Sequence, residues 1–369
     1  MEVRVIRTSD EFESLSKPWE RLLERSSYRN VFLTFEWLFT WWRCCGIRHK
    51  LRIVLVYDNG ELVGIAPLMI SKEYGFRRLS FISTGSADFE DFIIESDENG
   101  RSRVIELIFG TLLKDSDWDI FKLQGIREDS PNFPFFQLLS NNACDFKNCC
   151  FEMTAHQDGA FYIDTSGQVE DYFGTLRRRF LSDTRRLKAR LFKLGNVNFC
   201  DGSLETERIS TILEKHIELH VSRRRSVKTR SMFEDPSVRH FFKHVAIAFA
   251  RNGWLDLAFI EVNNTFAATH LGYKYGGHFF SYTLGLDDQY LECGIGRLMF
   301  FYLIERCFKD NFRTFDFMLG GEKYKAFFNP KMKNLHFVTM YPKTVLGVAA
   351  YLLFQRCNML YKKARGKKW

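Results

Sequence analysis

One segment of the chain, 281–330, limits its possible folds more than any other. It reads as a strand, an acidic turn, a helix start marked by glycines, a long apolar helix, a second strand at 314–319 and a Gly320-Gly321 break. That order places the free N–H groups of a helix start beside the end of a strand, and such groups bind phosphate. We therefore expect a pocket for a phosphate-bearing ligand, which favours group-transfer chemistry.

Length and composition predict two globular domains. The chain has 369 residues, of which 46% are hydrophobic and 16% aromatic. Domains of roughly 150–180 residues are common, so two are expected, and this composition excludes a largely disordered chain. The longest uncharged apolar run near the C-terminus, 344–355, is about half as long as a membrane span. The N-terminus also lacks the layout of a signal peptide, so we expect a cytoplasmic protein.

The cysteines and histidines do not predict a metal site. None of the nine cysteines forms a C-x-x-C pair, which argues against a zinc ribbon or a disulfide framework. His216 and His220 stand four apart on an expected helix, a spacing compatible with metal. They lack the H-E-x-x-H order, and no third ligand stands out. No metal is therefore expected.

The order of expected elements repeats in the two halves of the chain. The first half contains a hairpin signal at Asn59-Gly60, a pair that favours positive φ. In the second half, strands between 254 and 284 form a meander, and strands at 314–319 and 335–341 are expected to close it. This repetition predicts a duplicated α/β (α+β) fold. Its expected parts are an N-terminal domain 1–165, a C-terminal domain 166–342 and a basic amphipathic helix 343–369.

The helix start at Gly294-Ile295-Gly296 is the candidate donor site. Glycines let the backbone approach a phosphate closely, and Arg297 could add a charge-assisted contact. A lone G-x-G is also explained by ordinary helix-entry glycines. Both interpretations remain open on position alone.

The candidate catalytic residues follow this helix. Asp316 lies in a strand between two phenylalanines and faces away from both, so it could orient a substrate amine or act as a base. Lys325 could stabilise a developing oxyanion and Tyr324 could donate a proton. The alternatives are a structural aspartate and a surface lysine.

Two further sets of residues are candidates for substrate binding. Asp88, Glu90 and Asp91 form an acidic cluster that could hold sugar hydroxyls, an amine or a metal, although a solvated acidic turn explains it equally well. His270 lies in the predicted meander, where a histidine at the core or its rim is the more common case. It is kept as a candidate contact to substrate.

Basic residues are concentrated in a few segments of a chain with formal net charge +8. They occupy the expected helix 177–193, the triplet Arg223-Arg224-Arg225 and the C-terminal tail 362–368. Such segments suit an anionic ligand, an acidic membrane surface or nucleic acid. A solvated helix face is the alternative for each of them.

Several segments in a fixed order resemble a known family. The chain resembles the CelD-type GNAT-like acetyltransferases, named for an association with cellulose and exopolysaccharide biosynthesis, over about residues 15–340. The matching segments are FLTFEWLFTWW, ELVGIAPLMI, GSADFEDFII, LRRRFLSDTRRLKARLFKLG, LGLDDQYLECGIGRLMFFYLIE and FDFMLGGEKYKAFF. This family is similar to the Fem-type peptidyl transferases, which carry two tandem GNAT-like domains with mixed central sheets.

The resemblance implies a donor, an acceptor and a reacting centre. The donor would be acyl-CoA, acetyl-CoA above all, bound at Gly294–Arg297, and the acceptor an amine or hydroxyl of a sugar or peptidoglycan-like precursor. Tyr324-Lys325 matches the aromatic-lysine pair of Fem-type enzymes, with Tyr where those often carry Phe. However, residues 290–296 depart from the usual Q/R-x-x-G-x-G/A loop. An aminoacyl-tRNA donor held by the basic helix is therefore the alternative.

The sequence as a whole predicts an acyltransferase that acts on a cell-envelope or exopolysaccharide precursor. Lys325 would stabilise the oxyanion, Tyr324 would assist proton transfer, Asp316 would orient the acceptor, and the acidic cluster would contact it. One alternative is a Fem-type aminoacyl-tRNA-dependent transferase. Another is a non-catalytic module of polysaccharide machinery, with peripheral membrane contact through the basic C-terminus.

Overall fold

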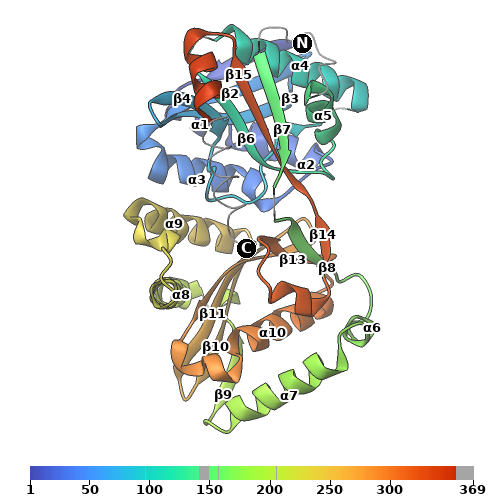
Figure 1. The fold of residues 1–369 in the computed structure, drawn as a ribbon, viewed down its shortest axis with the longest axis vertical. Coiled ribbons are helices and arrows are strands. Elements are labelled where there is room, and N and C mark those ends of the chain that lie inside the picture. Colours follow the sequence, from blue (N-terminus) through green and yellow to red (C-terminus); the bar gives the residue numbers. More distant parts are fainter. Residues whose placement is uncertain (96, 116, 141–148, 157, 205, 355–369) are drawn as a thin grey trace. The chain divides into compact units, whose positions relative to one another are not determined.

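The computed structural model describes the chain except residues 96, 116, 141–148, 157, 205 and 355–369 (Figure 1). It forms two compact units, one made of 1–157 with 334–369 and the other of 158–333. Each unit has its own mixed sheet flanked by helices. Among the described residues, none of the helices is long and apolar enough to cross a membrane.

The first unit is built on a sheet of order β1-β2-β3-β4-β6-β15-β7, with β5 paired to β3. β2 and β3 form the hairpin predicted at Asn59-Gly60, whose φ angles of 48° and 84° are both positive. The prediction of this turn is confirmed. The strands are β1 (Glu2–Ile6), β2 (Lys50–Asp58), β3 (Glu61–Glu73), β4 (Phe76–Phe81), β5 (Ile93–Ile94), β6 (Ile120–Arg127), β7 (Cys149–Ala155) and β15 (Leu335–Pro342).

The helices of the first unit bury apolar stripes, and short polar side chains cap three of them at the N-terminus. Phe109 of α4 is fully buried, and its ring centroid lies 5.4 Å from that of Phe121 in β6. Thr34 accepts a hydrogen bond from the Trp37 N–H and so begins α3. The helices are α1 (Ser9–Glu13), α2 (Ser16–Arg25), α3 (Phe35–Cys45), α4 (Glu98–Lys114) and α5 (Phe133–Ser140).

The second unit has a sheet of order β14-β8-β13-β12-β11-β10-β9. Its strands are β8 (Ala160–Asp164), β9 (Val197–Asp201), β10 (Leu255–Val262), β11 (Thr265–Tyr275), β12 (His278–Leu286), β13 (Thr314–Leu319) and β14 (Lys331–Lys333). Its helices are α6 (Val169–Gly174), α7 (Arg178–Phe192), α8 (Ile209–Ser226), α9 (Pro236–Arg251) and α10 (Ile295–Lys309), with short 3₁₀ turns η6 (Asp288–Cys293) and η7 (Lys325–Phe328).

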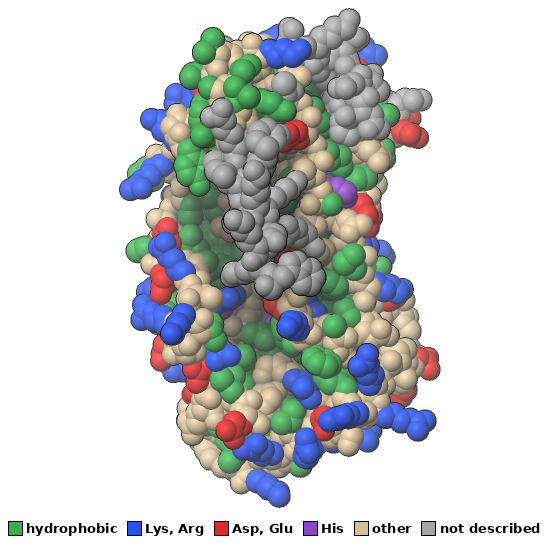
Figure 2. Space-filling model, in the orientation of Figure 1, with side chains coloured by type: hydrophobic (Ala, Val, Ile, Leu, Met, Phe, Trp, Pro, Cys, Tyr) green, Lys and Arg blue, Asp and Glu red, His purple; other side chains and the backbone are tan. Residues whose placement is uncertain are grey.

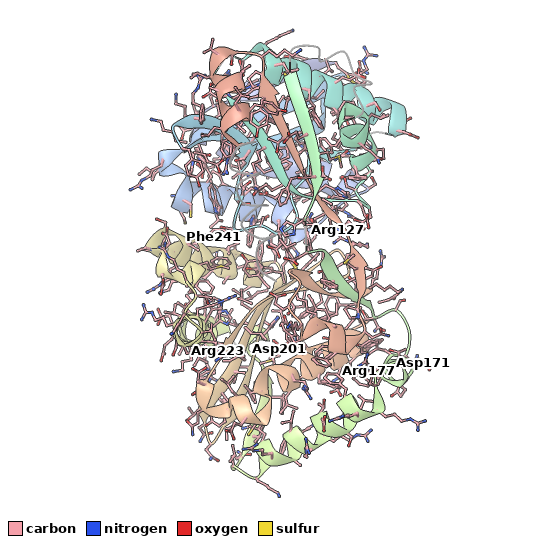
Figure 3. All side chains as sticks on the ribbon, viewed as in Figure 1. Arg127, Asp171, Arg177, Asp201, Arg223 and Phe241 are labelled. Carbon is pink, nitrogen blue, oxygen red and sulfur yellow. The ribbon has the colours of Figure 1, made fainter. Side chains whose placement is uncertain are left out.

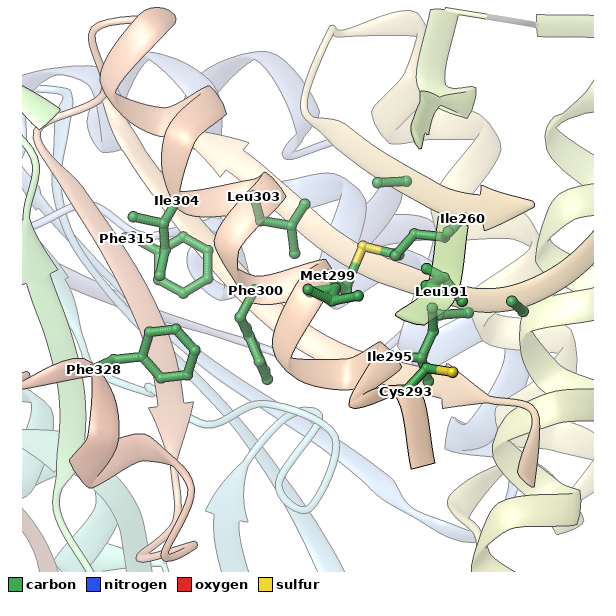
Figure 4. Packing of buried hydrophobic residues seen from close by; sticks show 14 of the residues in the cluster. Leu191, Ile260, Cys293, Ile295, Met299, Phe300, Leu303, Ile304, Phe315 and Phe328 are labelled. Atoms are coloured by element: carbon green, nitrogen blue, oxygen red, sulfur yellow. The ribbon is translucent and has the colours of Figure 1, made fainter. Parts of the chain in front are cut away.

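Helices α8 and α10 cover opposite faces of this second sheet. Neighbouring residues of a strand point to opposite faces. In β11, Thr269 hydrogen-bonds His216 of α8, whereas the next residue, His270, contacts Asp256, which is bound by Arg306 of α10. In Figure 4 the buried face of α10 packs on the sheet, with its side chains pointing toward β10 and β13.

The last strand belongs to a different sheet from the one predicted. Residues 335–341 were expected to close the second sheet, but β15 pairs with β6 and β7 of the first unit, with Leu335 opposite Arg127. Strand β8, placed in the first half by prediction, pairs with β13 and β14 of the second. The units therefore divide the chain at 157 and 333 rather than at 165 and 342. Alternation along a strand marks its buried face but does not identify its neighbours.

Candidate active site

The second sheet opens between its two parallel neighbours, β12 and β13. They share three register pairs, of which the last joins Phe280 and Asp316. Beyond that pair β12 runs on to Leu286, while β13 runs on beside β8 with an irregularity before Leu319. Among the described strands, the edge of β12 that faces this opening has no further partner in register. Unpaired backbone groups at such an edge can bind a ligand.

A bulge in β12 lies at the same place. Ser281 is paired with Gly272 and Thr283 with Leu271, so Tyr282 is an extra residue on this strand. Bulges redirect side chains and are frequent beside active sites. The bulge begins one residue after the last pair shared with β13, which marks the start of the opening.

The start of α10 adjoins the free end of β12. Gly294 has φ of +64° and forms the N-cap of α10, directly after η6. A Cβ atom at Gly296 would lie 3.3 Å from Leu286 Cδ1, so the first turn of α10 is close to the end of β12. This is the strand-end and helix-start arrangement predicted from the sequence, and the glycine at 294 suits a conformation that other residues rarely adopt.

Helix α7 covers part of this helix start. Leu187 is so close that a Cβ atom at Gly294 would lie 2.7 Å from Leu187 Cδ1. Arg190 pairs with Glu292, and the Arg297 guanidinium carbon lies 4.7 Å from the centre of the Phe180 ring. Arg297 therefore faces α7, and its partial burial lowers its pKa. A donor phosphate at this helix start would approach from the Gly296 side.

Asp316 lies at the mouth of the opening, in its last shared pair. It is 3% exposed, and its Oδ1 accepts a hydrogen bond of 2.8 Å from the Met318 N–H. Its neighbours Phe315 and Phe317 belong to the core under α10, so Asp316 faces away from them as predicted.

Lys325 is buried at the end of β13 rather than on the surface. Only 2% of it is exposed, and its Nζ donates to the carbonyl oxygens of Met318, Leu319 and Gly320 at 3.2, 3.2 and 2.9 Å. The Glu322 carboxylate lies 2.9 Å away. Lys325 thus holds the backbone where β13 turns into the Gly320-Gly321 break.

Tyr324 lies next to Lys325 and stacks on α10. Its ring centroid is 5.1 Å from that of Phe300, with the planes 19° apart. Burial, followed by the negative charge of Glu322, raises the pKa of Tyr324. Although 39% of the residue is exposed, the phenol stays protonated near neutral pH and can donate a hydrogen bond. Asp316 and Lys325 both bind the backbone of Met318 at the end of β13, whereas Tyr324 stacks on Phe300 of α10.

His270 is fully buried and belongs to a hydrogen-bonded network of polar side chains. Its Nδ1 lies 3.1 Å from Asp256 Oδ1, and its Nε2 lies 3.0 Å from Ser281 Oγ. Arg306 donates to both Asp256 and Asp201 at 2.7 Å (Figure 3). Burial lowers the pKa of His270 despite its hydrogen bond with Asp256, so the ring is neutral. Both ring nitrogens are engaged, and a substrate contact would require one of them to change partner.

Sequence reasoning missed four members of this polar network, Asp201, Asp256, Ser281 and Arg306. The available signal was a charged residue inside an apolar element. Asp256 stands near the start of the strand LDLAFIEV, and Arg306 lies in a helix that is otherwise mostly apolar. A buried charge requires a partner, so two such residues in neighbouring elements indicate a pair.

The acidic cluster Asp88, Glu90 and Asp91 lies in the first unit. Glu90 and Asp91 are buried rather than solvated, and Asp88 is half-buried. Asp91 accepts hydrogen bonds from the Phe92 N–H, the Asn132 amide and the Ser130 hydroxyl. Burial raises the pKa of Asp91 to about 6 and that of Glu90 well above its ordinary value. The alternative of a solvated turn is wrong for these two residues, and their contact with an acceptor stays a prediction.

A comparison with protein families finds a match in this second unit. Residues 178–326 match the family described as "Acetyltransferase (GNAT) domain". They form a GNAT acetyltransferase domain. The match covers α7, the β12–β13 opening, the start of α10 and all but the end of the β13 turn. The prediction of a GNAT-like acyltransferase enzyme is thereby confirmed, which argues against a non-catalytic module.

Solved structures match nearly the whole chain in fold. FemX has a TM-score of 0.62 at 12% identity, covering 96% of this chain and 99% of that chain. A conserved protein of unknown function from Bacteroides thetaiotaomicron has a TM-score of 0.60 at 13% identity, covering 92% and 100%. The C-terminal domain assigned to a lysylphosphatidylglycerol synthetase of Agrobacterium fabrum has a TM-score of 0.54 at 9% identity, covering 94% and 95%.

These likenesses concern the fold. The structure contains two mixed sheets, one in each unit. The predicted fold of two tandem GNAT-like domains is therefore confirmed. No curated relative matches the chain significantly.

Proposed function

We propose that this enzyme transfers an acyl group, acetyl in the first instance, from acyl-CoA to an amine or hydroxyl of a cell-envelope or exopolysaccharide precursor in the cytoplasm. The observation that carries the proposal is the parting of β12 and β13 after Phe280 and Asp316, beside the start of α10 and inside the GNAT domain. The role in cellulose or exopolysaccharide biosynthesis follows from the CelD-type resemblance and belongs to this proposal.

The residues around the opening suit the chemistry of direct transfer. The acceptor nitrogen or oxygen attacks the thioester carbon, the new C–N or C–O bond forms, the C–S bond breaks, and the acceptor proton passes to the leaving thiolate. Asp316 orients the acceptor, and the Tyr324 hydroxyl relays the acceptor proton, giving its own proton to the thiolate and taking the acceptor's in return. Lys325 stabilises the oxyanion, for which its Nζ exchanges one backbone carbonyl for the reacting oxygen.

Donor binding is assigned to the start of α10. Gly296 and the N–H groups of the first helical turn contact the donor phosphate, and Ile295 lies buried beneath them. Gly294 supports this turn through its positive φ angle, and Arg297 contributes positive charge from beside α7. The acceptor side includes the prediction that Asp88, Glu90, Asp91 and His270 contact substrate.

Calorimetry with acetyl-CoA and with longer acyl-CoAs tests the donor. We expect micromolar to millimolar binding that weakens with salt, because phosphate contacts are screened. Replacing Gly296 with Trp should abolish binding, since the side chain would fill the space beside Leu286. The control Gly110→Trp is matched, because nothing lies within 4 Å of a Cβ at Gly110. No binding of any acyl-CoA by the unaltered protein would overturn the proposal.

A specific observation favours a second candidate, an aminoacyl-tRNA donor. Leu187 packs on Gly294 and leaves α7 over part of the helix start that would hold CoA phosphate. Helix α7 also presents exposed cations, including Arg177 at its N-terminal boundary (Figure 3). A gel shift with charged tRNA, lost at moderate salt, would favour this donor, whereas saturable acetyl-CoA binding without any shift would exclude it.

Peripheral membrane contact through the C-terminal end is also proposed. Residues 345–354 are helical, and Val345, Leu346 and Leu352 are 87%, 51% and 56% exposed. Ala350 is buried in a cluster with Ile120 and Tyr341. The predicted basic residues 362–368 lie outside the described part of the chain. Flotation with anionic vesicles should depend on residues 343–369, and equal flotation after their removal would contradict this contact.

A further inference from the structure

A cavity of about 430 Å³ lies in the second unit. It is lined by residues of α6, α7, β9 and α10. This volume falls within the range of roughly 300–1,000 Å³ typical of small-molecule pockets. The residues of α10 that line it are Leu298, Phe301, Tyr302 and Glu305, whereas the residues assigned to transfer and donor binding, 294–297, 316, 324 and 325, are not in its lining. The cavity is therefore distinct from the proposed transfer site.

Five of the ten residues that line this cavity are apolar, namely Phe173, Leu181, Phe199, Leu298 and Phe301. The other five are Thr184, Arg185, Lys188, Tyr302 and Glu305. The one hydroxyl of α7 in the lining, that of Thr184, already donates a hydrogen bond of 2.7 Å to a backbone carbonyl within its own helix. A ligand body with many polar atoms would lose its hydration here without compensation, so a hydrocarbon chain or ring fits the walls best.

Two cations stand at the rim of the cavity. Arg185 and Lys188 line it from α7, three residues apart on one helix face, and both are exposed. Among the residues that the structure describes, neither forms an ion pair with a carboxylate. The Lys188 ammonium lies 5.8 Å from the centre of the Phe199 ring, at the boundary between charge and apolar wall. Glu305 is the one acidic residue in the lining, so two positive charges face one carboxylate.

The surroundings of the rim are also positive. Arg177, Arg178 and Arg179 are exposed and form no ion pair with any residue in the described part of the chain. Figure 2 shows Lys and Arg side chains along the lower edge of the molecule, where Figure 1 places α7. A field of one sign over a low-dielectric hollow concentrates oppositely charged ligands.

We propose that this cavity binds an anionic amphiphile, with its apolar chain between α7 and α10 and its phosphate or carboxylate head against Arg185 and Lys188. An inorganic anion or a nucleic acid backbone would use the rim but leave the apolar walls unfilled. The proposal stands on the cavity alone and does not depend on the transfer reaction. The head group could belong to a lipid in a bilayer or to a free amphiphile.

Calorimetry on the full chain with dodecyl phosphate below its micelle concentration is the test. We expect saturable one-site binding, at least about tenfold tighter than that of dodecyltrimethylammonium or inorganic phosphate. Dodecyltrimethylammonium lacks the anionic head, and inorganic phosphate lacks the apolar chain. Equal binding of phosphate and dodecyl phosphate would overturn the proposal, as would binding of a short RNA duplex that dodecyl phosphate does not displace.

Paired variants show whether the cations at the rim bind the head group directly or whether the net positive charge of the protein alone explains binding. Arg185→Glu with Lys188→Glu should weaken dodecyl phosphate binding at least about tenfold, while the control Arg178→Glu with Arg179→Glu changes net charge equally and should have an effect below about threefold. Leu181→Trp should block the cavity, and a thermal melt shows whether that variant is folded. An equal loss in both charge variants would overturn the assignment.

Flotation with vesicles shows whether the head group belongs to a bilayer lipid or to a free amphiphile. If full-length protein floats with phosphatidylglycerol vesicles and the Arg185→Glu, Lys188→Glu variant does not, the ligand is a bilayer lipid. If dodecyl phosphate binds but the rim variant leaves flotation unchanged, the ligand is a free amphiphile. Binding to neither would contradict the proposal.

Discussion

At the scale of single residues, the charged and polar groups around the end of β13 and around His270 are held by specific partners. Lys325 has four oxygen partners, and His270 lies between Asp256 and Ser281. The sequence could predict that Lys325 and Asp316 have specific roles, because a charged side chain among apolar neighbours requires a partner or a function. It could not predict their partners, since these come from elements distant in the sequence or from the turn geometry itself.

Lys325→Met should separate stabilisation of the oxyanion from a purely structural role. We expect the transfer rate to fall about 10²–10³-fold, as on removal of an oxyanion donor, with acyl-CoA binding retained. The measurement is transfer of labelled acetyl groups from acetyl-CoA to acceptors in an envelope-precursor extract. Lys323→Met, at an exposed position in the same turn, is the control. An unchanged rate in a folded Lys325→Met variant would disprove this role.

Histidines inside the second unit should make its stability depend on pH. Burial lowers the pKa of His220 from 6.5 to about 4, and its Nδ1 lies 2.8 Å from Ser231 Oγ. Between these pH values the unfolded chain binds more protons, so stability is complete above pH 6.5 and falls as the pH drops toward 4. The loss from this group is about 3 kcal/mol.

Hydrogen exchange of peptides from α8, followed from pH 7 to 4.5 with correction for intrinsic rates, measures this dependence. His220→Asn should flatten the slope, because the side chain no longer titrates. His240→Asn, at an exposed position of α9, is the matched control and should leave the slope unchanged. Identical slopes in the His220 variant and the unaltered protein would contradict the prediction.

At the scale of elements, helices were predictable from their apolar stripes but their packing partners were not. The apolar stripe of the basic helix predicts that Phe180, Leu187, Leu191 and Leu194 are buried. Phe180 and Leu191 are buried and Leu187 is half-buried, but the prediction is wrong for Leu194, which is 48% exposed just past the end of α7. Its contact with Gly294 could not be foreseen, because sequence periodicity marks a face and not what covers it. The same limit explains the misplaced strand at 335–341, whose neighbours are set by the sheet and not by its own pattern.

Gly294→Ala should destabilise the second unit and weaken donor binding. The φ angle of +64° is unfavourable for alanine, and the new Cβ would press on Leu187, so we expect a loss of about 2–4 kcal/mol. Gly60→Ala is the control, because Gly60 has φ of +84° with nothing within 4 Å and should lose only about 1 kcal/mol. Equal losses, measured by denaturant unfolding, would show that α7 does not constrain this helix start.

At the scale of the whole molecule, the chain leaves the first unit and returns to it. Residues 334–369 belong with 1–157, so the second unit is an insertion between β7 and β15 of the first. The two tandem GNAT-like domains could be predicted from the repeated pattern of elements. The positions where the chain passes between the units could not be predicted, because the sheets that β8 and β15 join are decided by strands distant in the sequence.

The division into units predicts which fragments fold. A fragment 158–333 retains β8 between β13 and β14 and should unfold cooperatively, whereas 166–342 lacks β8 and carries β15 without its partners. We expect dispersed amide resonances and a sharp thermal transition for the first fragment only, since a sheet with a missing inner strand loses its hydrogen-bond ladder. Cooperative unfolding of 166–342 would show that the units divide at the predicted positions instead.

The central claim is that the opening between β12 and β13 receives the acyl donor. Hydrogen exchange of the full-length protein with and without saturating acetyl-CoA tests it most directly. The account predicts slower exchange in peptides covering 281–298 and 314–325, with the first unit unchanged. Protection that is absent from both peptides, or confined to α7, would contradict the assignment of the donor site.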